Sequence, residues 1–219
     1  EVAHIGASYH NVKTGNITLV REQPPLLKIV VGIPLATLDL DFSAEDCNKI
    51  LEGTKYTENN KTYDSEWTNP EQRQFGICLL YANDYNTILL LSRTVMMFIS
   101  IVLALSIFFF TKKIYGQKAA VFALFLYVFE ASIIAHSTLV TMDIAVSLFM
   151  FLTIFSLWNF VKIPNNQNLL ITAIFFSLAQ VSKFTALYLI PVIFVFVILL
   201  VYKKLLKTTD AVKLLTVMV

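Results

Sequence analysis

The chain has 219 residues, of which 57% are hydrophobic and only 15% are charged, and its mean hydropathy is +0.68. Soluble domains carry about 25% charged residues, so this composition excludes an ordinary soluble protein and indicates a membrane protein. Residues 1–86 hold twelve acidic and seven basic side chains, whereas residues 87–219 hold three acidic and ten basic ones. We therefore expect an aqueous front region followed by a membrane-embedded remainder.

The front region contains two short segments with the pattern of helices. Residues 1–12 have helical spacing that places Glu1 and His4 on one face. Residues 25–35 form an apolar run that is too short to cross a bilayer and is interrupted by Lys28, which predicts an interfacial or re-entrant helix.

The rest of the front region is polar and contains both cysteines of the chain. Residues 41–75 are expected to form a solvated excursion. Cys47 and Cys78 could pair on the oxidising side of a membrane, or they could remain two unpaired thiols.

About five transmembrane spans are predicted after the front region. The apolar stretches are residues 87–110, 119–135 and 144–161, followed by a longer one at 169–202. The last stretch is too long for one helix and is interrupted by Ser182–Lys183, so it is divided there into two spans joined by a tight turn.

The orientation of these spans follows from the distribution of lysines in the short loops. Lysines cluster in the cytoplasmic loops of membrane proteins. On the opposite side, the short turns contain only Lys183, so residues 1–86, 136–143 and 182–185 are predicted to lie on the extracytoplasmic face. The lysines that define the cytoplasmic side are Lys112, Lys113, Lys118, Lys162, Lys203, Lys204 and Lys207.

Between residues 87 and 202 the only acids are Glu130 and Asp143. An ionisable group at membrane depth is costly, so each is a candidate functional residue. Asp143 could equally be an acid that caps an outer helix start. The alternative for Glu130, which the sequence favours, is a buried acid that is protonated or paired with another helix.

Three basic or titratable side chains are further candidates on the outer face. His136 shares a short turn with Asp143, although a single outer histidine is more often a surface residue. Lys183 is a lysine in a short extracytoplasmic turn, where the preference of lysines for cytoplasmic loops predicts none. An anionic ligand at the headgroup level would explain its position. A snorkelling lysine that meets lipid phosphates is the alternative, and the same two interpretations apply to Arg93.

Several stretches in order resemble the C-type (GT-C) membrane glycosyltransferases, in particular the protein O-mannosyltransferase-like group that uses polyprenyl-phosphate sugars. Glu1-Val-Ala-His4-Ile, with Gln23-Pro-Pro-Leu-Leu-Lys28 downstream, resembles the first outer loop of that group. Ala135-His136-Ser137 through Thr141-Met142-Asp143 resembles its second outer loop. Ser182-Lys183-Phe184-Thr185-Ala186 resembles a turn between later spans.

The resemblance implies an all-α polytopic membrane bundle whose site lies on the extracytoplasmic face. The donor would be a polyprenyl-phosphate sugar, and the acceptor a hydroxyl of a protein or glycolipid. The expected catalytic residues are Glu1, His4 and Asp143, and the expected contacts to the carrier are given by Lys28, Arg93, His136 and Lys183.

The same resemblance bears on the ends of the chain and on its partners. The group's first outer loop opens with an Asp-Glu pair, so an Asp is expected ahead of Glu1. The chain also begins without an initiator Met and stops inside a new apolar run, so it is expected to be a fragment that lacks material at both ends. Besides donor and acceptor, membrane lipids are the expected partners, no nucleic acid is expected, and a prokaryotic plasma membrane is preferred to the endoplasmic reticulum. No cofactor is predicted, and a role for a divalent metal is left open.

Two other classes of protein fit parts of the pattern. A secondary transporter would use Glu130 and Asp143 to bind a coupling ion, and would show repeats or helices broken by Gly or Pro. A non-catalytic membrane subunit would use the front region as an outer docking domain. The sequence contains no Walker loop, dinucleotide fingerprint or paired-cysteine metal motif that would indicate another activity.

Overall fold

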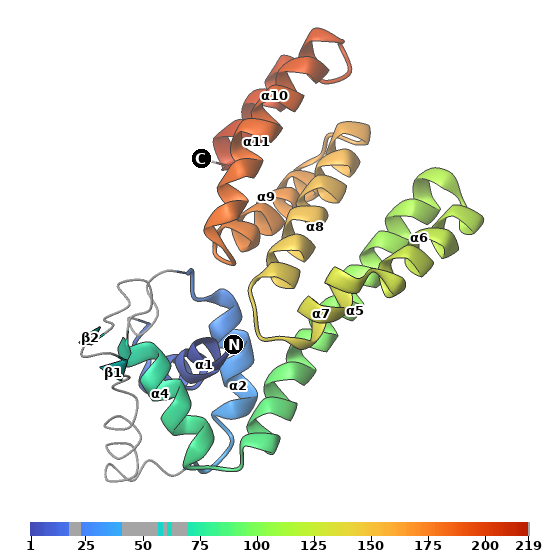
Figure 1. Cartoon of the computed structure of the whole chain (residues 1–219). Helices are drawn as coiled ribbons and strands as arrows, with labels where there is room; N and C mark the ends of the chain where they lie inside the picture. The colour runs from blue at the N-terminus through green and yellow to red at the C-terminus, as the bar shows by residue number, and fades with distance from the viewer. Residues whose placement is uncertain (18–22, 41–56, 59–60, 63–69, 219) are drawn as a thin grey trace. The chain divides into compact units, whose positions relative to one another are not determined.

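The computed structural model describes residues 1–17, 23–40, 57–58, 61–62 and 70–218. The chain divides into two compact units, whose helices and strands are labelled in Figure 1. The first comprises Glu1–Met97 and Ser137–Thr141, and the second comprises Phe98–His136 and Met142–Val219. Cys47 and most of the expected polar excursion lie outside the described residues.

The first unit is built around helix α1 (Val2–Thr14), which packs against α2 (Leu26–Leu35) and α4 (Pro70–Tyr81). The two helices predicted in the front region are therefore confirmed. α4 was not predicted, because its first half falls in the stretch expected to be a solvated excursion. A short antiparallel ladder joins β1 (Thr57–Glu58) to β2 (Lys61–Thr62).

Small residues allow these three helices to approach closely. A Cβ atom at Gly6 would lie 2.8 Å from the Cα of Gly76, and one at Gly32 would collide with the carbonyl oxygen of Ser8. Cys78 on α4 is disulfide-bonded. A disulfide is typical of an oxidising compartment, which agrees with the predicted extracytoplasmic position of this unit.

α5 (Tyr85–Tyr115) is the longest helix among the described residues, and its part up to Met97 groups with the first unit. After Gly116, whose φ of +87° is a conformation that glycine adopts without strain, α6 (Gln117–Phe129) begins. The buried Tyr127 hydroxyl of α6 lies 2.8 Å from Ser100 Oγ of α5. α7 (Ala131–Thr138) follows α6 after a single residue and is bent by 65° from it.

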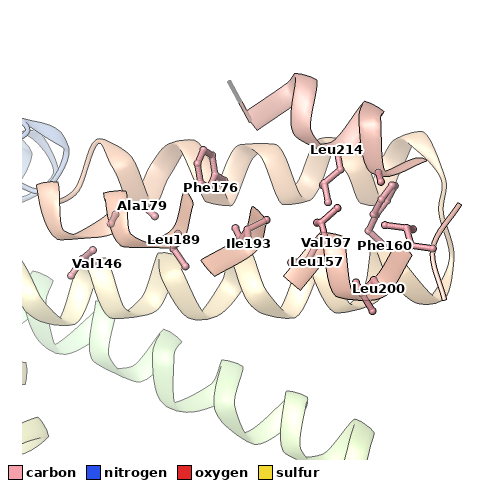
Figure 2. Close-up of a cluster of buried hydrophobic side chains, with 13 residues drawn as sticks. Val146, Leu157, Phe160, Phe176, Ala179, Leu189, Ile193, Val197, Leu200 and Leu214 are labelled. Carbon is pink, nitrogen blue, oxygen red and sulfur yellow. The ribbon is translucent and has the colours of Figure 1, made fainter. Parts of the chain in front are cut away.

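The rest of the second unit is a helical bundle formed by α8 to α11. Its core gathers Phe160, Phe176, Ile193 and Leu214 from different helices (Figure 2). α8 ends at Lys162, close to the predicted end of its apolar stretch, and the Asn165 side chain accepts a hydrogen bond from the Asn168 amide at 2.7 Å to cap α9. The elements are α8 (Asp143–Lys162), α9 (Asn166–Gln180), the 3-10 helix η1 (Phe184–Tyr188), α10 (Leu189–Tyr202) and α11 (Thr208–Met218).

The expected all-helical membrane bundle is confirmed, although the number of spans differs from the prediction. In the described part of the chain, Tyr85–Tyr115, Asp143–Lys162 and Phe184–Tyr202 are long and apolar enough to cross a membrane. A fourth crossing results if the bent pair α6–α7 is one span. α9, the remaining apolar stretch, has 15 residues, whereas a crossing helix needs about 20.

Candidate functional site

The candidate residues form two polar clusters, one within each unit. The first contains Glu1, Arg93 and the backbone amide of Val140. The second contains His136, Asp143 and Lys183.

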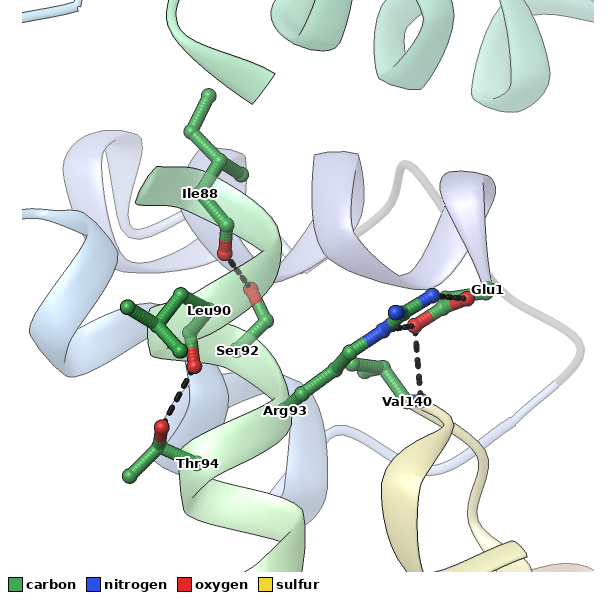
Figure 3. Close-up of polar contacts among 7 residues, drawn as sticks. All are labelled: Glu1, Ile88, Leu90, Ser92, Arg93, Thr94 and Val140. Carbon is green, nitrogen blue, oxygen red and sulfur yellow. Dashed lines mark hydrogen bonds and ion pairs between the residues drawn. The ribbon is translucent and has the colours of Figure 1, made fainter. Parts of the chain in front are cut away.

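Glu1 and Arg93 form a bidentate ion pair in the first unit (Figure 3). Arg93 Nε donates to Glu1 Oε1 and Arg93 Nη2 donates to Glu1 Oε2, both at 2.9 Å. The Val140 amide also points toward Glu1 Oε1, at 3.5 Å. The Glu1 side chain is 18% exposed and that of Arg93 is 38% exposed. Glu1 precedes α1 and Arg93 lies near the start of α5, so the pair ties the two helices together.

The surroundings of Glu1 keep its carboxylate ionised. Burial raises the pKa of Glu1, but the hydrogen bond and positive charge of Arg93, with the Val140 amide, outweigh it and leave this pKa below its ordinary value. A carboxylate with a lowered pKa is a weaker proton acceptor. Glu1 is therefore better suited to orient Arg93 than to take a proton from a substrate.

Two further candidates lie in the first unit. His4 is on the first turn of α1 and is partly buried, and its carbonyl accepts a hydrogen bond from Ser8 Oγ at 2.7 Å. Lys28 is 1% exposed on α2, and its Nζ donates to the Gln23 carbonyl at 2.7 Å. A lysine buried in this way holds the start of α2 in place, and in this conformation it does not face solvent.

In the second unit, Lys183 and Asp143 form the shortest ion pair among the candidates. Lys183 Nζ lies 2.6 Å from Asp143 Oδ1, and His136 Nδ1 lies 3.8 Å from the other carboxylate oxygen. The second distance is too long for a hydrogen bond, and it joins opposite charges only when His136 is protonated. Asp143 is the first residue of α8, and Lys183 immediately precedes η1 with extended backbone angles.

This arrangement leaves donors available for an anion. An ammonium has three N–H groups, and among the described residues one of those of Lys183 is bonded to Asp143, which leaves two. The Lys183 side chain is 24% exposed and that of Asp143 is 43% exposed, so both remain accessible. The Asp143 carboxylate fixes the direction of the ammonium group.

Glu130 is found neither buried nor paired with another helix, which corrects the interpretation favoured from the sequence. It is exposed at the break between α6 and α7, with φ −75° and ψ 116°. Its Oε1 accepts a hydrogen bond from the Ser132 amide at 3.4 Å, at the start of α7. The acid therefore meets unpaired amides at a helix N-terminus, which offset its charge.

Two of the contacts above, those of Arg93 and of the Val140 amide with Glu1, were not predicted from the sequence, which also left metal binding open. Within the described ranges, no group of three His, Cys, Asp or Glu side chains is placed to hold a metal ion. The pairing of Arg93 with Glu1 was missed, because Arg93 was assigned to the carrier. The signal was present, since an arginine within an apolar span calls for a carboxylate partner. The Val140 amide carries no sequence signal.

Comparison with known proteins identifies one family. The sequence profile of the family described as dolichyl-phosphate-mannose-protein mannosyltransferase matches residues 80–219. The matched region contains Arg93, His136, Asp143 and Lys183. Neither a curated protein nor a solved structure matches the chain.

Proposed function

The chain belongs to the dolichyl-phosphate-mannose-protein mannosyltransferase family, and we propose on this basis that it transfers a sugar from a polyprenyl phosphate to an acceptor hydroxyl on the extracytoplasmic face. Family membership identifies a membrane glycosyltransferase of the polyprenyl-phosphate-mannose type. The carrier, the acceptor (a protein or a glycolipid) and the face are parts of the proposal. A prokaryotic plasma membrane is the proposed location.

The observation that carries the proposal is the ion pair between Lys183 and Asp143. The departing group of the donor is a phosphate, whose negative charge grows as the bond to the sugar breaks. A cation held in a fixed direction stabilises that charge without having to reorganise. Lys183, with two remaining N–H donors and a carboxylate 2.6 Å behind it, has this property.

The proposed reaction is a direct displacement at the anomeric carbon. The acceptor oxygen forms a bond to this carbon, the bond to the phosphate oxygen breaks with its electron pair, and the acceptor proton passes to a base. In such a displacement the base and the leaving phosphate lie on opposite sides of the carbon. Because Asp143 is bonded to the cation assigned to the phosphate, we assign Asp143 to the leaving-group side, as a positioning residue.

The remaining candidates receive supporting roles. Glu1 holds Arg93, whose unused N–H groups suit a second contact to an anionic donor. His4 and His136 make the surroundings polar. Lys28 fixes α2, the short apolar helix proposed to border the path of the lipid chain.

The test is an assay with polyprenyl-phosphate mannose and the full-length protein in lipid vesicles. Lys183→Ala is expected to lower kcat/KM at least tenfold, and Asp143→Asn to lower it less while the KM for the donor rises. The matched control is Lys203→Ala, which removes an exposed lysine beyond α10 and should retain wild-type rates. Wild-type kcat/KM in Lys183→Ala would refute the assigned role of Lys183, and a wild-type protein that transfers no sugar would refute the function itself.

One observation keeps the transporter alternative open to test. A break within a span, at an acidic residue, is a feature of ion-coupled transporters. The break between α6 and α7 has this character at Glu130, although residues 117–138 contain neither Gly nor Pro. Ion flux in the same vesicles would distinguish the two, since the transferase proposal predicts none.

A further inference from the structure

The break between α6 and α7 occurs without the proline or glycine that most often causes a sharp bend. Sharp bends in helices occur at proline, at glycine or serine pairs, or where a polar group enters the hydrogen-bond ladder. Residues 117–138 contain no proline and no glycine, yet the helix turns by 65° over one residue. The polar group at the break is Glu130.

The backbone bonds on either side show that one helix ends and another begins at this residue. The Glu130 amide donates to the Tyr127 carbonyl at 3.4 Å, which closes α6. The Glu130 carbonyl accepts from the Ile134 amide at 3.0 Å, which opens α7. The Glu130 carboxylate accepts from the Ser132 amide, so this side chain caps the helix that follows it.

The acid and the break support each other energetically. Glutamate is a good helix former, so it does not break a helix through its backbone preference. In an uninterrupted apolar span, however, its charge would meet lipid without compensation. At the break it meets the amide end of α7, where the helix dipole favours negative charge.

The break in turn decides where His136 lies. His136 is six residues beyond Glu130, or about 9 Å along α7 at 1.5 Å per residue. If α6 continued straight instead of turning by 65°, His136 would be displaced by roughly 10 Å. The contact of His136 with Asp143, at 3.8 Å, would then be lost.

We infer that Glu130 is a positioning residue for the transferase site, which holds the break between α6 and α7 and so keeps His136 against the Asp143–Lys183 ion pair. This inference rests on the proposed function. It assigns Glu130 no contact with substrate and no ion to bind. Its role is conformational, and it acts through α7.

Substitution with leucine separates this role from an ordinary contribution to stability. Glu130→Leu removes the only charged side chain between residues 119 and 135 and puts a strong helix former at the break, which favours a straight helix. We expect kcat/KM for sugar transfer to fall at least tenfold, while the thermal unfolding midpoint in detergent stays the same or rises. Glu130→Asp, which keeps a carboxylate that can cap α7, should retain at least half of the wild-type kcat/KM. Val128→Leu, at an exposed position of α6, is the matched control and should have no effect.

A double-mutant cycle tests whether the loss of kcat/KM in Glu130→Leu is caused by the displacement of His136. In a His136→Ala background, Glu130→Leu should cause less than a twofold further loss, because the group that it displaces is already absent. Fully additive losses would refute the route through His136. Wild-type activity in Glu130→Leu, or equal losses in Glu130→Asp and Glu130→Leu, would refute the inference as a whole. These outcomes require a wild-type protein that transfers sugar, so they are distinct from a failure of the proposed function.

Discussion

The Glu1 carboxylate has two neighbours that favour its ionised form and one influence that opposes it. The guanidinium of Arg93 and the amide of Val140 stabilise the negative charge, while partial burial destabilises it. The first two prevail, so the pKa of Glu1 in the folded protein is below that in the unfolded chain. Stability linked to such a group is fully present above the unfolded value and is lost as the pH falls through the folded value.

The pH dependence of stability should therefore differ between the wild type and Arg93→Gln. Near neutral pH we expect the variant to unfold about 2–4 °C lower, which corresponds to about 1 kcal/mol for a partly exposed ion pair. As the pH falls below the ordinary glutamate value of 4.5, this difference should narrow, because Glu1 becomes protonated. The measurement is the unfolding midpoint in detergent across this range.

Arg73→Gln is the matched control, because Arg73 is an exposed arginine of α4 in the same unit. The difference in unfolding midpoint between Arg73→Gln and the wild type should not change as Glu1 becomes protonated. If the Arg93→Gln difference stays constant down to strongly acidic pH, the ion pair does not hold Glu1 in its ionised form.

At the scale of helices, the crossing of α1 with α2 depends on a single missing side chain. Gly32 lies in the middle of α2, where alanine would be favoured by about 1 kcal/mol on helix propensity alone. A Cβ atom there would collide with the Ser8 carbonyl of α1 and would lie 2.6 Å from Val12 Cγ2. A backbone carbonyl within a helix cannot move aside. The collision therefore outweighs the gain in helix propensity and determines whether alanine stabilises or destabilises the protein.

Gly32→Ala should therefore destabilise the protein, by about 2 kcal/mol, because an overpacked contact costs more than the helix propensity returns. Chemical or thermal unfolding in detergent measures the change. Ile33→Ala removes a side chain from the neighbouring position, which is 57% exposed, and serves as the control with little expected effect. A Gly32→Ala protein that is more stable than the wild type would show that α1 and α2 do not approach as closely as described.

Local patterns were sufficient to predict some elements and insufficient for others. α1, α2 and α8 have apolar or helical spacing with a clear end, such as the polar turn after Lys162, and each was predicted. α4 was missed because its first half is polar and its apolar second half is too short to show a helical period, and its helix is stabilised by packing on α1. The break at Glu130 was missed for a related reason, since it depends on a side-chain cap and not on Gly or Pro.

For the candidate site, the sequence predicted which residues carry charge but not all of their partners. Asp143 at a helix start and His136 in the preceding turn follow from chain order alone. The pairing of Glu1 with Arg93, 92 residues away, depends on tertiary packing that no local pattern encodes. Lys28 was expected at the carrier, yet it lies buried against the Gln23 carbonyl, because a lysine in an apolar run gives no sign of its direction.

For the whole molecule, the central expectation is that the front region and the Lys162 turn lie on opposite sides of the membrane. The lysine distribution predicts this orientation, and the disulfide at Cys78 agrees with it. Tyr81 at the end of α4 is 79% exposed, and Lys162 at the end of α8 is also exposed. Cysteines introduced at these two positions are therefore accessible probes of the two faces.

A membrane-impermeant maleimide applied to intact cells should label Tyr81→Cys and not Lys162→Cys, and permeabilisation should expose the second. Native Cys78 should not react without reduction, because its sulfur is held in a disulfide and the residue is only 3% exposed. Labelling of Lys162→Cys from outside, with Tyr81→Cys protected, would invert the orientation. A sugar donor delivered to the outer leaflet would then meet the wrong face of the protein, so the orientation decides whether the Lys183–Asp143 pair can reach the carrier phosphate.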